Sequence, residues 1–182
     1  PITKEYRIGF KYMEMGYLHG NNFELNNIAH GIMRELVFKT GYLSGMSVLY
    51  NGWMYVTMTI LPLESTSELR DVGPRLPAHI TAGGLAILAH LSPQQQKAYC
   101  ETSHRESFLT PLYKLEDMEK DVEQIRSKGY ALGKTFTNKN TSESIGAPVF
   151  GRDGKVISAL VLISPSGGFA EEILPDLSNN LM

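Results

Sequence analysis

The stretch RLPAHITAGGLAILAHLS, residues 75–92, holds the residues whose types and spacing point most directly to chemistry. The sequence predicts that a helix begins within it and that the first turn, Ala82-Gly83-Gly84, is almost bare of side chains. Because glycine in a helix costs about 1 kcal/mol relative to alanine, the bare turn needs a reason. Two reasons stay open. The backbone N–H groups of the turn could bind a carboxylate or another anion, or the small residues could let the helix lie close on a sheet.

Apolar side chains elsewhere in the chain could complete a binding site around such an anion. The candidates that the sequence offers are Leu76, Leu85, Met54, Met58 and Val161. Together they predict a small pocket with an anion-binding end and an apolar body.

His79 stands at the entrance of the same helix, where it could either brace the turn or act as a catalytic base. We favour the bracing role, because an active site needs titratable groups that converge, and the sequence shows no acid or nucleophile partner for His79. Cys100 and His104 are one helical turn apart, but no electropositive surroundings mark a reactive thiolate.

Two other patterns carry little weight as functional sites. Glu101-x-x-His104 could supply two metal ligands from one helix face, but a metal site needs three or four, so a solvated helix face is the simpler interpretation. The motif SPSGG, Ser164 to Gly168, lacks the lysine of a phosphate-binding loop and is predicted to be a turn after the last strand. We therefore predict no catalytic residue, no metal and no cofactor.

Length and charge limit the classes of function. The chain has 182 residues, enough for one well-buried domain. Its 17 Lys and Arg against 19 Asp and Glu give a net charge of −2, whereas domains that bind nucleic acid usually carry a basic excess. A single cysteine excludes an internal disulfide and fits a reducing cytoplasm. The sequence has no run of 18 apolar residues, so no membrane partner is predicted.

Periodicity and turn signals predict an α+β fold with a largely antiparallel sheet. Asn51-Gly52 predicts a hairpin between strands over 43–50 and 53–61, and Asp153-Gly154 predicts one between strands over 145–150 and 156–164. The other predicted elements are helices over 22–41, from 80 onward, from 93 onward with Ser92 as N-cap, and over 110–129, a strand over 130–137 and a polar loop over 138–144.

Two of these helices show apolar residues at three- and four-residue steps, which predicts that each turns one face toward the core. In the first helix these residues are Phe23, Leu25, Ile28, Ala29, Ile32 and Leu36. In the last helix they are Leu115, Met118, Val122 and Ile125.

Four segments, in the same order along the chain, resemble the IclR-type bacterial transcription regulators. RLPAHITAGGLAILAHLS resembles their R-L-P-x-H-x-T/S-A-x-G-K-A-L-L-A, and YRIGFKYMEMG resembles the Y-R-L-G…E-L-G end of their winged-helix head and linker. LEDMEKDVEQIRSKGYAL resembles their L…L…I-R…G-Y-A, and IGAPVFGRDGKVISALVLISP resembles their I-A-A-P-V-F…G-x-V…A-L-S-I-S-G-P. The four matches together cover nearly the whole chain.

The resemblance implies a GAF-like effector-binding domain over residues 21–182, with a central antiparallel sheet flanked by helices. Residues 1–20 would be a remnant of the winged-helix head, with its last strand near Tyr6 to Phe10, and the linker. Such regulators are cytoplasmic, bind DNA only through that N-terminal head, and assemble as homodimers or homotetramers. They sense small organic acids or aromatic effectors allosterically, by a shift in the spacing of the DNA-binding heads.

Carried over residue by residue, the resemblance implies an effector site between the sheet and the helix after R-L-P-x-H. Its residues are Leu76, Ala82, Gly83, Gly133, Ser144, Ile145, Val161 and Ile163. Leu85 stands where the family usually has lysine, and Gly133, Val161 and Ile163 stand where members that sense small hydrophilic acids have an acidic residue and serines. The loop over 134–144 also carries an extra residue.

These departures imply a drier pocket, in which an unpaired ligand hydroxyl would cost about 1–3 kcal/mol. We therefore expect an acid with an apolar or aromatic body, and poor binding of acids as small and polar as glyoxylate. Two other functions stay open. A small-molecule enzyme would need groups that converge on His79, and a ligand-free assembly module would have close packing and no cavity beside Ala82 and Gly83.

Overall fold

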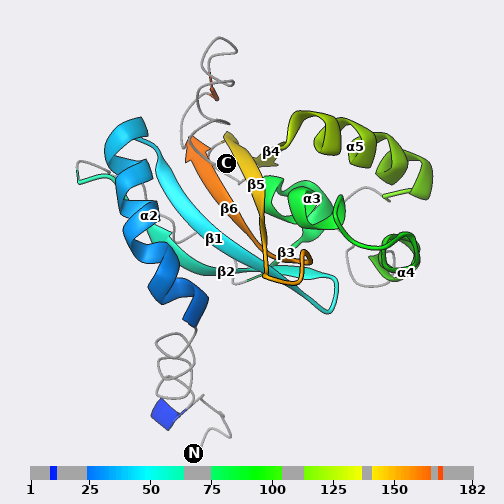
Figure 1. Ribbon diagram of the computed structural model, residues 1–182, viewed down its shortest axis with the longest axis horizontal. Coiled ribbons are helices and arrows are strands. Elements are labelled where there is room, and N and C mark those ends of the chain that lie inside the picture. The colour runs from blue at the N-terminus through cyan, green and yellow to red at the C-terminus, as the bar shows by residue number, and fades with distance from the viewer. Residues whose placement is uncertain are drawn as a thin grey trace, which may run out of the picture.

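The computed structural model describes residues 9–11, 24–63, 75–103, 113–136, 141–164 and 168–169. These residues form a six-stranded sheet with helices on both faces (Figure 1). In chain order the elements are α2 (Glu24–Thr40), β1 (Leu43–Tyr50), β2 (Trp53–Ile60), β3 (Arg75–Pro77), the 3-10 turn η2 (Ala78–Ile80), α3 (Ala82–Leu88), α4 (Pro93–Ser103), α5 (Leu115–Lys128), β4 (Ala131–Phe136), β5 (Thr141–Phe150) and β6 (Val156–Ser164).

The strand order is β3-β2-β1-β6-β5-β4, and every neighbouring pair is antiparallel. Asn51 and Gly52, with φ of 49° and 80°, make the tight turn between β1 and β2, as their types predict. Gly154 has a φ of 74° in the turn between β5 and β6. The predicted α+β fold with an antiparallel sheet is confirmed.

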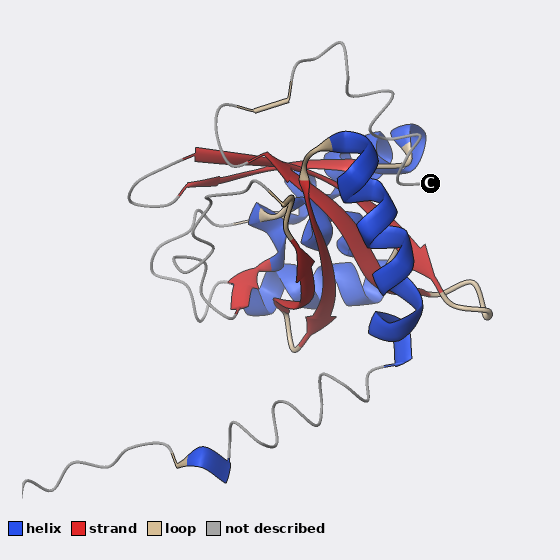
Figure 2. Cartoon of the chain, turned by 90° about the vertical axis from the view of Figure 1, so that its left-hand side faces the viewer, coloured by secondary structure: helices blue, strands red, loops and turns tan. Residues whose placement is uncertain are grey.

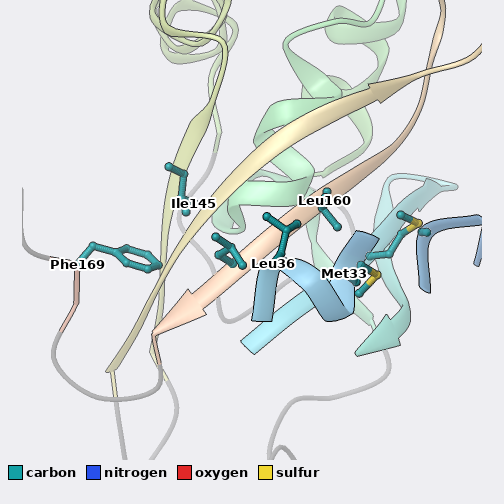
Figure 3. Close-up of a cluster of buried hydrophobic side chains, with 8 residues drawn as sticks. Met33, Leu36, Ile145, Leu160 and Phe169 are labelled. Carbon is teal, nitrogen blue, oxygen red and sulfur yellow. The ribbon is translucent and has the colours of Figure 1, made fainter. Parts of the chain in front are cut away.

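One face of the sheet is covered by α2, which packs on the inward-facing residues of the central strands. Figure 3 shows Met33 and Leu36 of α2 close to Ile145 of β5 and Leu160 of β6, with Phe169 beside them. Gly41, with a φ of 70°, ends α2 as predicted and donates its N–H to the carbonyl of Val37.

The other face carries α3 directly, and α4 and α5 lie further out on that side (Figures 1 and 2). Ser92 caps α4 as predicted, since its Oγ accepts the N–H of Gln95 and its own N–H donates to Gln95 Oε1. Gly129, with a φ of 82°, ends α5. None of the described helices has the length and apolar character needed to cross a membrane.

Three expectations about the elements need correction. β5 begins at Thr141, so the second half of the predicted polar loop is strand, because it continues the pairing with β4. A 2.7 Å ion pair between Lys134 and Glu143 reinforces that pairing. Leu115 is 38% exposed at the start of α5, and Ile28 and Ile32 of α2 are exposed because only the neighbouring residues of the helix face the sheet.

The predicted N-terminal remnant, residues 1–20, lies mostly outside the described residues. Of the strand predicted near Tyr6 to Phe10, the structure describes Gly9 and Phe10, and Phe10 and Lys11 are helical instead. Asn22 and Phe23 also lie outside the described residues.

A polar pair fixes α2 to the sheet at a β-bulge. Asn26 is 6% exposed, its Nδ2 donates to the carbonyl of Thr57 at 3.1 Å, and its Oδ1 accepts the Thr57 hydroxyl at 3.0 Å. The register of β1 and β2 shifts between Met46 and Ser47, opposite Thr57. The pair therefore satisfies polar groups that the bulge takes out of the ladder.

We predict that Asn26→Ala lowers the free energy of unfolding by about 1–3 kcal/mol, because it leaves the half-buried Thr57 carbonyl without its donor and the Thr57 hydroxyl with only the Met46 carbonyl, 3.4 Å away. Urea denaturation measures the change. In a double-mutant cycle with Thr57→Val the two effects should be less than additive, since both changes break the same contact. Full additivity would contradict the assigned pair.

Candidate functional site

The first turn of α3 is capped by Thr81. Its extended backbone, with φ of −124° and ψ of 143°, turns the chain out of η2, and its Oγ1 accepts the N–H of Gly84 at 3.0 Å. The same hydroxyl lies 3.1 Å from the Ala78 carbonyl and 2.9 Å from Met54 Sδ. The cap thus ties the helix to both η2 and β2.

The glycines of this turn are in close contact with their surroundings. A Cβ on Gly83 would lie 2.4 Å from Ser47 Oγ and 2.9 Å from Val161 Cγ2. A Cβ on Gly84 would lie 2.1 Å from the carbonyl oxygen of Ala78. No side chain fits at either position, so close packing, one of the two reasons that the sequence leaves open, is present.

Two glycines of the sheet, Gly133 and Gly146, contact the backbone at the start of α3. A Cβ on Gly133 would lie 2.3 Å from the backbone nitrogen of Ala82, and one on Gly146 would lie 2.9 Å from the nitrogen of Gly83. The N–H groups at the start of the helix, which have no acceptor within the helix, therefore lie against bare backbone of β4 and β5. Anion binding by these groups stays a prediction.

The far end of α3 is held by side chains from the outer helices. Gln96 Nε2 of α4 donates to the carbonyl of Leu88 at 2.9 Å, and Arg126 Nε of α5 donates to the carbonyl of Ala89 at 2.8 Å. Both bonds satisfy carbonyl groups that a helix end leaves free. The position of α3 on the sheet is thus fixed at both ends.

The structure brings most of the predicted site residues to this face of the sheet. Gly133 of β4 pairs with Ser144 of β5, which pairs with Ile163 of β6. Val161 lies two residues from Ile163 and therefore faces the same way. Leu76 of β3 pairs with Met54, half-buried beside the cluster under α3 and α4.

Ile145 and Met58 do not join this group. Ile145 follows Ser144 in β5 and so points to the opposite face, where it is fully buried against α2 (Figure 3). Met58 pairs with Met46 and contacts the same cluster on the α2 side. Both residues belong to the core under α2, not to the surroundings of α3.

Two residues of β1 that the sequence analysis did not single out face α3. Ser47 is 2% exposed, and its hydroxyl has no hydrogen-bond partner among the residues that the structure describes. Gly45, two residues earlier on the same face, pairs with Val161. A Cβ on Gly45 would have only the Met58 carbonyl oxygen, 3.9 Å away, within 4 Å of it in the described part of the chain. In LSGMSVLY, alternate residues point to opposite faces of the strand, and this period of two is the sequence signal that could have identified Gly45 and Ser47.

His79 is braced as predicted. The Tyr99 hydroxyl accepts the backbone N–H of His79 at 3.1 Å and lies 2.7 Å from its Nδ1. The hydroxyl and Nδ1 share one hydrogen bond, and its donor depends on the tautomer of the imidazole. The Tyr113 ring stacks on the imidazole at 5.0 Å, and its hydroxyl donates to Asp121. The histidine joins η2 to α4 and α5.

The groups around His79 are held in their neutral forms. Burial raises the pKa of Tyr99 to about 12. Burial, followed by the hydrogen bond to Asp121, raises the pKa of Tyr113. Burial and the charges of Asp117 and Glu101 raise the pKa of the Cys100 thiol. A raised thiol pKa opposes a nucleophilic role, because the thiolate is the reactive form.

The other predicted motifs can be placed only in part. His104 lies outside the described residues, and those that are described include no group of three or more His, Cys, Asp or Glu residues that could hold a metal. Ser164 Oγ donates to the carbonyl of Gly168, whose φ is 89°. Residues 165–167 lie outside the described residues, so the turn over SPSGG stays a prediction.

Comparison with known proteins identifies the family. Residues 16–182 match the family described as "Bacterial transcriptional regulator IclR C-terminal". The chain belongs to the IclR family. The four sequence segments that resemble this family therefore indicated the correct one.

Similar proteins include the HTH-type transcriptional regulator XynR of Escherichia coli, 29% identical over 89% of this chain and 64% of that protein. The superposition on the crystal structure of Thermotoga maritima IclR covers 100% of this chain and 73% of the Thermotoga chain, with 21% sequence identity and a TM-score of 0.80. A third similar structure is the inducer-binding domain of PobR from Acinetobacter, a double mutant in complex with 3-hydroxybenzoic acid. Its superposition covers 85% of this chain and 95% of the PobR chain, with 22% sequence identity and a TM-score of 0.65.

This chain spans less than two-thirds of the length of XynR. Its curated IclR relatives are named as transcriptional regulators or repressors, and the family to which the chain belongs is that of the C-terminal part of such regulators.

The packing of α3 predicts an unusual pair of effects. Gly83→Ala should lower the free energy of unfolding by about 1–3 kcal/mol, because its Cβ meets Ser47 and Val161. Ser47→Ala should be neutral or stabilising, since the hydroxyl is buried without a partner, and should relieve part of the Gly83→Ala cost. Gly45→Ala, on the same strand as Ser47, is the matched control and should change the free energy of unfolding by no more than about 0.5 kcal/mol. Equal losses in Gly83→Ala and Gly45→Ala would contradict the contact.

The pKa of Tyr99 predicts an alkaline transition. A tyrosine pKa that is raised in the folded state contributes stability below the unfolded value near 10, and this contribution is lost as the pH rises toward about 12. Urea midpoints between pH 8 and 12 should therefore fall less steeply above pH 10 in Tyr99→Phe. Tyr50→Phe, at an exposed position, should keep the wild-type slope. A Tyr99→Phe slope equal to wild type would contradict the shift.

Proposed function

We propose that this chain is the effector-sensing domain of an IclR-type regulator and that a small organic acid binds between β1 and the first turn of α3. The observation that carries this proposal is the hydroxyl of Ser47, which is buried without a described partner and lies 2.4 Å from the place that a Cβ on Gly83, in the first turn of α3, would occupy. A buried polar group without a hydrogen bond costs about 1–3 kcal/mol. A carboxylate accepts hydrogen bonds from both hydroxyl and N–H donors and would offset that cost.

The body of the ligand has a place over Gly45. This glycine leaves room on the α3 face, next to Val161, and Ser144 and Ile163 lie along the same side. Apart from Ser144, these surroundings are apolar, which favours an acid with an apolar or aromatic body. The complex of the PobR domain with 3-hydroxybenzoic acid supports the same ligand class.

Ligand binding should move α3. A single Cβ does not fit between Gly83 and Ser47, so a carboxylate reaches the hydroxyl only if the first turn of the helix lifts from the sheet. The hydrogen bonds of Leu88 and Ala89 would pass this movement to α4 and α5. A ligand that prefers the lifted arrangement shifts the population of the two states.

In the cell the domain would act as part of a longer chain. We propose that it works in the cytoplasm as a homodimer or homotetramer and that a separate N-terminal winged helix binds DNA. The helix-turn-helix regulators among its relatives support this architecture, since they extend beyond the matched region. The net charge of −2 also agrees with a DNA-binding surface elsewhere.

The proposal predicts which acids bind. In a thermal-shift screen, benzoate-type aromatic acids should raise the melting temperature, whereas glyoxylate should not. At a concentration a hundredfold above Kd, a ligand adds about 2.7 kcal/mol of stability. Isothermal titration calorimetry then gives Kd for each hit. Tightest binding by the smallest and most polar acids would contradict the apolar surroundings.

Two variants locate the site. Gly45→Val fills the space over β1 and should abolish the shift while the domain stays folded, and Ser47→Ala should weaken binding of the carboxylate. Ile157→Val, at an exposed position of β6, is the control and should bind like wild type. Unchanged binding in Gly45→Val would place the ligand elsewhere.

A second candidate function rests on the close packing itself. The glycine contacts at Gly83 and Gly133 are those of a permanently packed helix, as an assembly module without ligand would need. A wide screen with no hit, on a domain that unfolds cooperatively, would favour this function.

A further inference from the structure

Polar contacts fix Gly168 and Phe169 to the sheet. Glu143 Oε2 accepts the backbone N–H of Phe169 at 3.1 Å, and Ser164 Oγ donates to the carbonyl of Gly168 at 3.2 Å. Gly168 has a φ of 89°, and a Cβ there would clash with the carboxylate of Glu143, so the position admits only glycine. We call Glu143, Ser164, Gly168 and Phe169 the C-terminal latch.

Phe169 is the apolar part of the latch. Its side chain is 9% exposed and belongs to the core under α2, where Figure 3 shows it beside Ile145. Its ring meets that of Tyr42 edge-on, with 4.9 Å between the ring centroids and 70° between the ring planes. The latch is therefore held both by a charged hydrogen-bond acceptor and by an aromatic side chain in the core.

Glu143 also connects the latch to the edge of the sheet. Its Oε1 lies 2.7 Å from Lys134 Nζ of β4, and β4 is an edge strand whose one neighbour in the sheet is β5. The hydrogen bond from Lys134, followed by that from the Phe169 N–H, lowers the pKa of Glu143 below its usual range. The carboxyl group is therefore ionised at neutral pH and binds both partners as a carboxylate.

The strand register places the latch next to the backbone that supports α3. Two adjacent rows of paired residues cross β4, β5 and β6, the first made of Lys134, Glu143 and Ser164 and the second of Gly133, Ser144 and Ile163. Because neighbouring residues of a strand point to opposite faces, the first row faces α2 and the second faces α3. Gly133 lies so close under α3 that a Cβ on it would clash with the backbone nitrogen of Ala82. A movement of β4 therefore changes the latch and the support of α3 together.

We propose that the C-terminal latch opposes the lifting of α3 and thereby regulates effector binding from the other face of the sheet. While Glu143 binds both Phe169 and Lys134, β4 stays in place and Gly133 supports the first turn of α3. When the latch opens, only the pairing with β5 holds β4, and α3 loses this support. The closed latch favours the packed state of α3, and the open latch favours the lifted state.

The regulation of effector binding rests on the proposed function, whereas the coupling of the latch to α3 does not. Such a coupling acts in both directions, because each site shifts the same equilibrium. A change at the latch must therefore be detectable at α3 without any ligand, and a ligand at α3 must be detectable at the latch.

Hydrogen exchange of single amides, followed by NMR without ligand, tests the coupling. Glu143→Gln should speed exchange of the Phe169 amide at least about tenfold, because a hydrogen bond to a charged group contributes at least that factor. The amides of Gly84 and Leu85, which both donate to Thr81, should exchange several-fold faster because the first turn of α3 opens more often.

The control for this variant is Glu35→Gln. It breaks an ion pair of the same 2.7 Å length, with Lys39 on α2, and should leave the exchange of all three amides unchanged. Unchanged exchange of the Phe169 amide in Glu143→Gln would overturn the latch. Faster exchange at Phe169 with unchanged exchange at Gly84 and Leu85 would overturn its coupling to α3.

A glycine pair gives a second, independent test. Gly168→Ala should reproduce the exchange pattern of Glu143→Gln, because the added Cβ displaces the carboxylate. Gly154→Ala is the matched control, since its φ of 74° imposes similar backbone strain but its Cβ would have no described atom within 4 Å. Circular dichroism checks that each variant is folded. Equal exchange patterns in the two variants would overturn the role of the Gly168 contact.

Isothermal titration calorimetry with benzoate tests the regulation. Glu143→Gln should bind benzoate at least about fivefold more tightly than wild type, because less free energy is needed to lift α3. Saturating benzoate should in turn speed exchange of the Phe169 amide in the wild-type chain. Equal or weaker binding by Glu143→Gln would overturn the regulation. Coupled exchange in a domain that binds no acid would support the latch and overturn only the proposed function.

Discussion

The close approach of α3 to the sheet is the constraint on which this structure depends. Bare backbone meets bare backbone there, since Gly83 and Gly84 of the helix and Gly133 and Gly146 of the strands have no room for a Cβ. Each glycine costs conformational entropy when the chain folds. In return, the first N–H groups of α3 lie directly on β4 and β5. The Thr81 cap and the bonds to Leu88 and Ala89 then hold the helix in place.

This constraint separates the two faces of the sheet. The face toward α2 is filled mainly with apolar side chains such as Met33, Leu36 and Ile145, and Ser44 is also buried on it without a described partner. The face toward α3 holds small residues and hydroxyl groups, and one of these, Ser47, has no partner among the described residues. A closely packed contact that still buries an unsatisfied hydroxyl has a reason to exist in two arrangements. That property would suit the effector-sensing role proposed for this domain of the IclR family.

The outer helices α4 and α5 show how a movement of α3 could be transmitted. α4 and α5 hold the far end of α3, while α2 lies on the other face with its outer side free of other described elements. Under the proposed function, the sensing site lies on one face of the six-stranded sheet and α2 lies on the other. Because packed helices move as rigid bodies, a small movement at α3 would reach α4 and α5 through the bonds to Leu88 and Ala89.

The sequence by itself determined the elements whose signals are local. Asn51-Gly52 fixed one hairpin, Gly41 and Gly129 ended two helices, and four matching segments indicated the IclR family, because turns and caps depend on a few adjacent residues. Only the tertiary structure decided which face each residue occupies. Strand residues alternate with a period of two, so Ser144 reached the α3 face and Ile145 the α2 face once the register was set. Ser47 and Gly45 became candidates for the same reason, and the exposure of Ile28 followed from how α2 docks on the sheet.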